Sequence, residues 1–260
     1  MKLILFSILL MSCQSGQPLD KTTMQDSPST DTYQQLSQDF LKSLQEEEPT
    51  DQYIKRLAAV DLDDLAKTVS TKQEKLAFWM NIYNALVQHR LVKDISQFDD
   101  RDAFFTEPFV DIGGVMMSFD DIEHGIIRNS RVKLGLGYLK DWFTPAWEKQ
   151  LRNTEIDGRV HFALNCGAKS CPPVAIYEAD RLDQQLDLSA TKYLKSVTSV
   201  EGKTIKTSPL FSWFRGDFGG KSGMKDLLHS LGAITQDQTQ YSIEFGDYDW
   251  TADIGNYIDL

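Results

Sequence analysis

The chain has 260 residues, of which 41% are hydrophobic and 11% aromatic, enough apolar material for one large domain with a real core. Its formal net charge of −11 repels phosphate backbones, so we expect no nucleic-acid partner. Beyond the N-terminal residues, no apolar run reaches the length that spans a bilayer.

The N terminus has the pattern of a bacterial lipoprotein signal peptide. Lys2 supplies a positive charge, and an apolar run too short to cross a bilayer follows from Leu3 to Met11. The run leads through Ser12 into Cys13, the position at which a lipoprotein accepts its acyl chains. We therefore predict a signal peptide over residues 1–12 and a lipid bilayer as a partner, reached through acylated Cys13.

The residues after Cys13 indicate location and organisation. Gln14, rather than an aspartate, follows the cysteine, which favours the outer membrane over the inner one, with the domain facing the periplasm. Residues 13–32 are rich in Ser, Thr, Gln and Asp and cannot bury a core, so they are predicted to form a flexible tether. The remaining residues, 33–260, are predicted to form one domain.

Helical spacing of apolar residues predicts a helix from about Asp31 to Leu44 and further helices over 51–60, 63–69 and 71–92. The last is apolar around most of its circumference and should be buried. Residues 100–110, with Pro108 as a breaker, are predicted to be irregular. There follow a strand over 115–117, a helix from Ser118 to Arg128, a strand over 160–165, and helices over 183–197 and 224–231 that flank a strand over 204–207. Many helices and few strands predict a helix-rich α+β domain with a small, mainly antiparallel sheet.

The predicted buried helix carries a polar stripe of amide side chains. Asn81, Asn84 and Gln88 share one face at spacings of three and four. A buried amide costs roughly 1–3 kcal/mol unless it is hydrogen-bonded, so the stripe should hold an irregular backbone segment. That segment is either an ordinary loop or a loop of an active site.

The helix after Ser118 places a carboxylate on its apolar face. Glu123 falls among the apolar residues of that face and must find a cation, hydrogen-bond donors or a proton. His124 lies beside the face, and Arg128 is one turn further on. Neighbours in a helix do not face each other, so we expect no direct pair between Glu123 and His124. A buried pair of Glu123 with Arg128 is the structural alternative.

The segment HFALNCGAKSCPP, residues 161–173, combines a histidine with two thiols. Gly167 and Ala168 leave space beside Cys166, and turn amides could lower a thiol pKa or form an oxyanion hole. Strand alternation would place His161 and Cys166 on opposite faces unless the strand ends near Asn165; otherwise His124 is the better base. Farther on, residues 210–220 are aromatic and glycine-rich enough to line a cleft.

Three blocks, AFWMNIYNAL, SFDDIEHGIIR and HFALNCGAKSCPP, resemble in order and spacing the domain of unknown function 547 family. The later YDW, residues 248–250, resembles its C-terminal signature, and the resemblance covers about residues 76–195 plus this tail. It implies an α+β domain, common in exported bacterial proteins. The shared Glu, His and Cys positions, here Glu123, His161 and Cys166, resemble the parts of a papain-like thiol site.

Two functions follow as hypotheses. In the first, the protein is a thiol hydrolase or acyl-transfer enzyme acting on peptide or peptidoglycan-like ligands: Cys166 is the nucleophile, His161 the base and Glu123 the group that orients the imidazole. Asn165 would help to stabilise the oxyanion, while Asn81 and Asn84 hold the loop. In the second, it is a non-catalytic binding or envelope-assembly module.

The two hypotheses assign different states to the thiols. In the binding module, Cys166 and Cys171 form a structural disulfide, which an oxidising compartment would favour. The enzyme requires Cys166 as a free thiol. We expect no cofactor and no metal, because C-x4-C with scattered histidines matches no usual zinc spacing.

Overall fold

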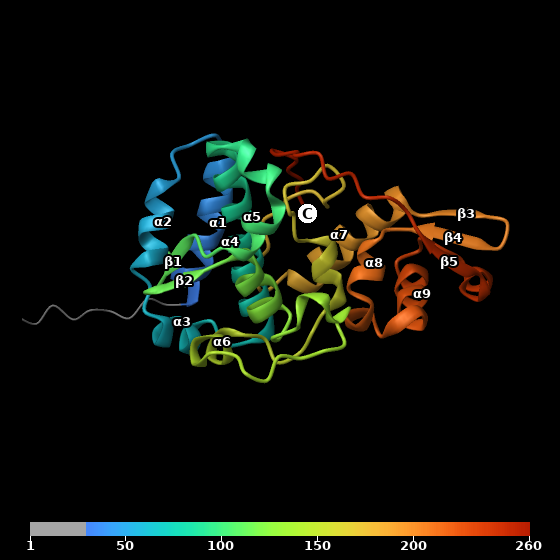
Figure 1. Cartoon of the computed structure of the whole chain (residues 1–260), viewed down its shortest axis with the longest axis horizontal. Coiled ribbons are helices and arrows are strands. Elements are labelled where there is room, and N and C mark those ends of the chain that lie inside the picture. The colour runs from blue at the N-terminus through green and yellow to red at the C-terminus, as the bar shows by residue number, and fades with distance from the viewer. Residues whose placement is uncertain (1–29) are drawn as a thin grey trace, which may run out of the picture.

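The computed structural model describes residues 30–260 (Figure 1). The predicted signal peptide and the acylation site Cys13 lie outside the described residues, as does nearly all of the predicted tether. Within residues 30–260, no helix combines the length and apolar character needed to cross a membrane.

The N-terminal half is built on the long helix α4, Lys72–Lys93. It starts with a reciprocal cap in which Thr71 accepts a hydrogen bond from the Glu74 backbone and the Glu74 side chain accepts from the Thr71 backbone. Three helices precede it, as predicted: α1 (Thr30–Gln45), α2 (Asp51–Ala58) and α3 (Leu62–Thr68). The later helices are α5 (Arg101–Thr106), α6 (Ala146–Leu151), α7 (Leu182–Val197), α8 (Leu210–Trp213) and α9 (Gly220–Ser230).

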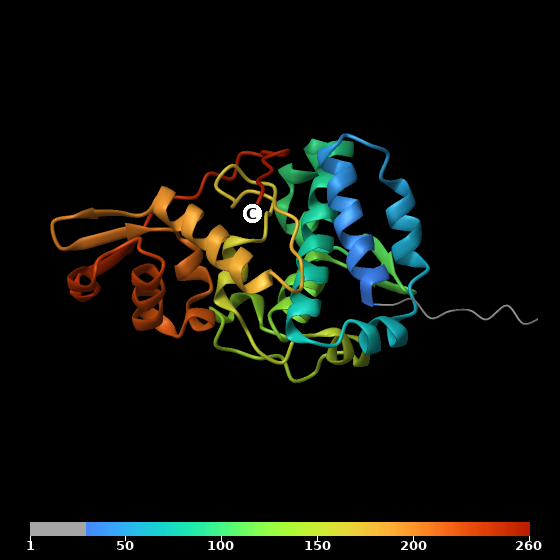
Figure 2. The same cartoon turned by 180° about the vertical axis from the view of Figure 1, so that it is seen from behind.

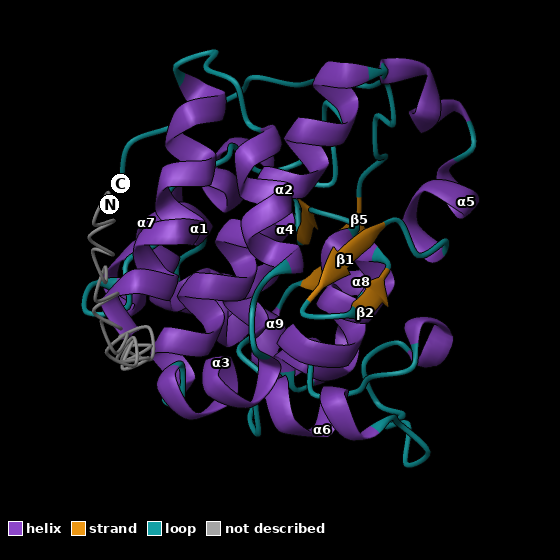
Figure 3. Cartoon of the chain, turned by 90° about the vertical axis from the view of Figure 1, so that its left-hand side faces the viewer, coloured by secondary structure: helices purple, strands orange, loops and turns teal. Residues whose placement is uncertain are grey.

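The strands form two small sheets. β1 (Val110–Ile112) and β2 (Val115–Met117) make an antiparallel hairpin in which Val110 lies opposite Met117. β3 (Ser199–Glu201) pairs antiparallel with β4 (Thr204–Thr207), and β4 pairs parallel with β5 (Ser242–Phe245). Figure 3 shows how far helices predominate over strands. The predicted α+β class is confirmed.

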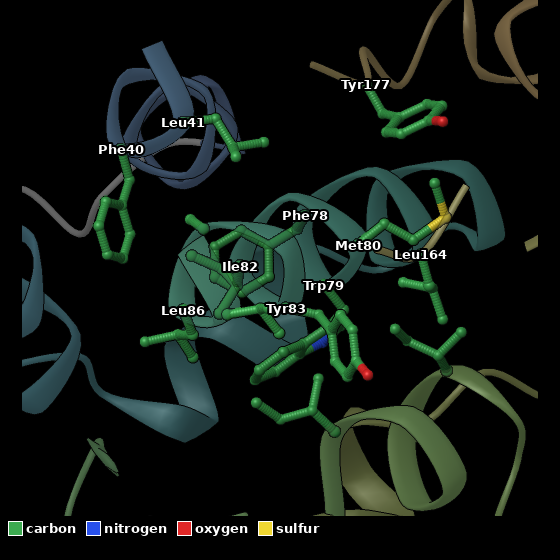
Figure 4. Packing of buried hydrophobic residues seen from close by; sticks show 14 of the residues in the cluster. Phe40, Leu41, Phe78, Trp79, Met80, Ile82, Tyr83, Leu86, Leu164 and Tyr177 are labelled. Atoms are coloured by element: carbon green, nitrogen blue, oxygen red, sulfur yellow. The ribbon is translucent and has the colours of Figure 1, made fainter. Parts of the chain in front are cut away.

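Two apolar clusters form the core. The larger surrounds α4, which buries side chains on all sides, and Figure 4 shows Met80 and Leu86 pointing to opposite sides of it. The smaller cluster joins α7, α8 and α9 to the second sheet. Phe162 belongs to the smaller cluster and Ala163 to the larger, so this segment connects the two.

Two element predictions were wrong. The segment predicted as a strand over 160–165 begins inside a 3-10 helix, Gly158–Phe162, and continues as irregular backbone. The helix starts there because the Asp157 side chain accepts a hydrogen bond from the Arg159 backbone and begins a turn. Residues 100–110 contain the short helix α5, capped by Asp100, whose side chain accepts from the Ala103 backbone. Pro108 lies beyond the end of α5 and so does not disrupt it.

The C-terminal tail returns to the middle of the molecule, beside the loop after the 3-10 helix (Figures 1 and 2). Isolated bridges pair Ala168 with Ala252 and Val174 with Tyr257. The loop that contains both thiols is therefore covered on one side by the last residues of the chain.

Candidate functional site

A pocket of about 320 Å³ lies where the two core clusters meet. Its walls are mainly aromatic and aliphatic, and a few ionisable groups gather in one part of it. This is the usual composition of a small-molecule site. The lining residues come from α4, α5, the helical segment after Ser118, residues 133–136, the 3-10 helix, the thiol loop, α8 with the residue after it, and the tail. They are Tyr83, Phe105, Asp120, Glu123, His124, Lys133, Leu134, Leu136, His161, Leu164, Cys166, Leu210, Trp213, Phe214, Tyr248 and Trp250.

The amide stripe of α4 holds the backbone that forms one side of this pocket. Asn84 donates to the Ala163 carbonyl at 3.0 Å and accepts from the Asn165 backbone at 2.8 Å. Gln88 donates to the Asn165 side chain at 3.3 Å and accepts from the Gly255 backbone at 2.9 Å. The prediction that the stripe holds irregular backbone is confirmed.

Asn81 and Asn165 hold neighbouring stretches of chain. Asn81 clamps Tyr177 by donating to its carbonyl at 2.8 Å and accepting from its backbone N–H at 2.9 Å. Asn165 donates to the Pro172 carbonyl at 2.8 Å and accepts from the Gly167 backbone at 2.9 Å. Its side chain is therefore used inside the thiol loop, from residue 165 to residue 172.

Cys166 and Cys171 form a disulfide across this loop, with their Cα atoms 6.2 Å apart. Cys166 lines the pocket and is half-buried, whereas Cys171 is only 5% exposed. The Tyr248 hydroxyl lies 3.3 Å from the Cys166 sulfur and 3.1 Å from the Cys171 sulfur. Among residues 32–260, no hydrogen bond joins an imidazole to the Cys166 sulfur.

Glu123 and His124 lie on a π-helical turn, Asp121–Ile127. The wider turn, with hydrogen bonds from residue i+5 to residue i such as Arg128 N–H to Glu123 C=O, changes which side chains meet. The Glu123 carboxylate lies 3.5 Å from His124 Nδ1, closer than α-helical spacing predicts, although the hydrogen bond at that nitrogen is made with Arg128. π-Helical geometry carries no simple sequence signature, and the α-helical spacing misled the prediction.

Burial raises the pKa of Glu123 to about 7, since the opposing influence of Arg128 and a hydrogen bond from Tyr83 is too weak to compensate. The Tyr83 hydroxyl donates to this carboxyl at 3.1 Å. Burial, followed by the nearby charge of Arg128, lowers the pKa of His124 well below its usual value. The imidazole is therefore neutral, and Arg128 Nη1 donates to its Nδ1 at 2.8 Å.

The carboxylate that contacts His161 is Asp217, not Glu123. His161 Nε2 and Arg128 Nε both lie against Asp217 Oδ2, at 2.8 Å and 2.7 Å. The His161 ring stacks on Phe214 with centroids 3.7 Å apart, and the Arg128 guanidinium lies 4.5 Å from the centroid of the same ring. The cation of Arg128 therefore pairs with Asp217, and not with Glu123 as the structural alternative had it.

Burial and hydrogen bonding determine the charge states in the buried network formed by Arg128, Asp217 and the two imidazoles. Burial lowers the pKa of His161 to about 4 despite its hydrogen bond to Asp217, so the ring is neutral near pH 7. Burial alone would raise the pKa of Asp217, but the hydrogen bonds with His161 and Arg128 outweigh it and hold that pKa below its usual value. The network is an ionised Arg128–Asp217 pair flanked by two neutral imidazoles.

Sequence reasoning singled out Glu123, His124, His161 and Cys166, and all four line one pocket. It also predicted that residues 210–220 line a cleft, and Leu210, Trp213 and Phe214 do so. Asp217 was missed as a partner although it lies in that segment. An arginine and an aspartate in an otherwise aromatic stretch (residues 215–217, RGD) were the available signal.

The described residues contain no group of three or more His, Cys, Asp or Glu side chains placed to hold a metal ion. Fold and site together define a helix-rich α+β domain with an aromatic pocket beside a disulfide-closed loop.

Comparison with known protein families gives a match over part of the chain. Residues 67–194 match the family described as "Protein of unknown function, DUF547", which supports the resemblance found in the three sequence blocks. No curated protein and no solved structure gives a significant match to the chain. The family match includes Glu123, His161 and Cys166 but ends before Asp217 and Tyr248.

Proposed function

We propose that this protein is a binding module whose pocket takes a peptide bearing an aromatic or large apolar side chain. The observation that carries the proposal is the aromatic wall formed by Trp213, Tyr248 and Trp250. The two indoles stack with centroids 5.7 Å apart and planes inclined by 20°, and the Tyr248 ring lies 4.7 Å from Trp250. Such rings bind apolar and aromatic groups with large contact area and little entropy loss.

The polar part of the pocket fits a peptide group. Glu123 titrates near neutrality, so its carboxyl can donate a hydrogen bond when protonated and accept one when ionised. A peptide offers both a carbonyl acceptor and an N–H donor. Nearby Lys133 and Asp120 neutralise each other at 2.8 Å, which leaves no unpaired charge in this pair to demand an ionic ligand.

The disulfide favours binding over thiol hydrolysis in this state. A nucleophile must be a free thiolate, whereas the Cys166 sulfur is bonded to Cys171. The Nε2 atom of His161 is engaged by Asp217 and the ring is held against Phe214. Catalysis by Cys166, His161 and Glu123 stays a prediction, and it would need the disulfide to be reduced first.

A fluorescence titration tests the binding proposal. The probe is N-acetyl-phenylalaninamide, compared with N-acetyl-alaninamide, added to the full-length protein. We expect the phenylalanine probe to change the tryptophan emission and Trp213→Ala to weaken its binding about tenfold, since a buried aromatic contact contributes roughly 1–3 kcal/mol. Trp142→Ala is the matched control, because Trp142 is 76% exposed and does not line the pocket.

The binding proposal fails if both probes bind equally, or if the Trp213 and Trp142 variants bind alike. Either result would mean that the aromatic wall does not recognise the ligand.

We also propose that Cys13 carries the acyl chains that tether the domain to the bacterial outer membrane. The lipoprotein pattern of residues 1–13 supports this proposal. Mass spectrometry of the mature protein tests it: the expected N-terminal peptide begins at a diacylglyceryl-modified Cys13, and Cys13→Ala should remove the modification. An unmodified N-terminal peptide starting at Met1 would contradict it.

A further inference from the structure

The two sulfurs of the disulfide have unequal surroundings. The Cys171 sulfur accepts hydrogen bonds from the backbone N–H groups of Cys166, at 3.0 Å, and Ala168, at 3.4 Å. The Tyr248 hydroxyl lies 3.1 Å from the Cys171 sulfur and 3.3 Å from the Cys166 sulfur, so it can donate to the thiolate that forms at Cys171. These donors would stabilise negative charge on Cys171 if the bond opened.

Cys166 has the complementary surroundings. No backbone N–H within residues 32–260 donates to its sulfur, and its side chain lines the pocket and is only half-buried. A thiolate held in the pocket can therefore reach Cys166, while Cys171 lines a different hollow and has only 5% of its surface exposed. Access favours attack at the Cys166 sulfur, and the hydrogen-bond donors favour departure of the Cys171 sulfur.

We propose that this disulfide is redox-active and exchanges with peptide thiols bound in the pocket, with Cys166 as the attacked sulfur and Cys171 as the leaving group. This inference rests on the proposed function in one respect, that the pocket admits a peptide. It adds the class of substrate: the bound peptide carries a cysteine thiol.

The reaction balances in two steps. A peptide thiol loses its proton, and its sulfur bonds to Cys166 while the Cys166–Cys171 bond breaks and Cys171 leaves as a thiolate. A second peptide thiolate then attacks the peptide sulfur of this mixed disulfide, and Cys166 leaves as a thiolate. Two peptide thiols are oxidised to one disulfide, the protein disulfide is reduced to two thiols, and the two protons released by the peptides reprotonate the cysteines.

The first experiment compares the two sulfurs. Each full-length variant carries Cys13→Ser, which removes the third cysteine. It also carries either Cys171→Ser, which leaves Cys166 as the one thiol, or Cys166→Ser, which leaves Cys171. Each is incubated with oxidised glutathione, and the mixed disulfide is followed by mass spectrometry. We expect Cys166 to be modified at least about tenfold faster than Cys171, because access limits the buried thiol. Equal rates, or faster modification of Cys171, would overturn the assignment.

The second experiment tests the leaving group. Reduced glutathione is added to the intact disulfide in otherwise unaltered Cys13→Ser protein, and Tyr248→Phe is compared with Tyr257→Phe. Loss of a hydrogen bond to a charged group should slow opening about tenfold in Tyr248→Phe. Tyr257→Phe, which removes a hydroxyl that makes no hydrogen bond to either sulfur, should open at the unaltered rate. Equal rates in the two variants would refute stabilisation by Tyr248.

Failure of this inference is distinguishable from failure of the proposed function. If N-acetyl-phenylalaninamide binds but the sulfurs react alike, the redox role is overturned and the binding module stands. If the sulfurs differ as expected but the probe does not bind, the exchange stands on the sulfur geometry and the aromatic peptide is the wrong ligand.

Discussion

Glu123 should make the stability of this protein depend on pH in a direction unusual for a carboxylate. Its folded pKa is about 7, against 4.5 for an exposed glutamate, because burial disfavours the charged form. A raised carboxyl pKa means that the folded state holds its proton more tightly than the unfolded chain. The corresponding stabilisation is present below pH 4.5 and is lost as the pH rises through 7.

The magnitude follows from the linkage relation. With these two pKa values, and 1.36 kcal/mol for each pKa unit, the free energy of unfolding should fall by about 2–3 kcal/mol between pH 5 and pH 8 on account of Glu123 alone. His161 changes the free energy of unfolding in the opposite sense. Its folded pKa is about 4, so the folded protein, which keeps this ring neutral, gains stability relative to the unfolded chain as the pH rises toward 6.5. A comparison with Glu123→Gln, which retains His161 and an acceptor for Tyr83, isolates the carboxyl.

Urea unfolding at pH 5 and pH 8 provides the measurement, with fluorescence as the signal. The unaltered protein should lose about 2–3 kcal/mol relative to Glu123→Gln over this interval. Glu155→Gln, at a side chain 75% exposed, serves as the control and should show no such difference. A constant difference between the protein and the Glu123 variant at both pH values would refute a raised pKa at this position.

Three further substitutions test the surroundings of the pocket by urea unfolding. Asn84→Ala should cost about 2–4 kcal/mol, because it leaves two buried backbone groups unpaired, and a cost below 1 kcal/mol would contradict the clamp. Arg128→Met should cost about 3–5 kcal/mol by leaving Asp217 buried without its cation, and a neutral effect would show that the pair is dispensable. Gly167→Ala should destabilise more than Gly202→Ala: both have positive φ, but only the first would collide with a neighbouring side chain, and equal losses would exclude the collision.

The parts of the fold that were predicted correctly depend on local pattern. Apolar spacing and the cap at Thr71 and Glu74 define α4 without reference to the rest of the chain. The prediction for segment 158–162 was wrong because the types of its residues suit a strand. The observed turn depends instead on the Asp157 side chain and on burial of Val160 and Phe162 in different apolar clusters. Alternation of apolar and polar residues cannot show that two apolar residues of one segment pack into different clusters.

In the candidate site, too, local sequence predicted single residues but not the contacts between distant ones. Glu123 was conspicuous as a carboxylate among apolar residues, and the loop after His161 was conspicuous by composition. The contact between His161 and Asp217 spans 56 residues, and nothing in either local sequence specifies it. The hydroxyl donor beside the disulfide is also a tertiary property, because Tyr248 approaches both sulfurs from the C-terminal tail.

The return of the tail to the thiol loop also sets when the site can be completed. Backbone hydrogen bonds run from Lys169 to Thr251 and from Val174 to Asn256, so one side of the loop is made by residues about 80 positions further along the chain. A ribosome synthesises these residues after the two cysteines and the whole of α4. The pocket therefore cannot assume its final form until residues 248–256 have been made and have docked, and the thiols stay accessible until then.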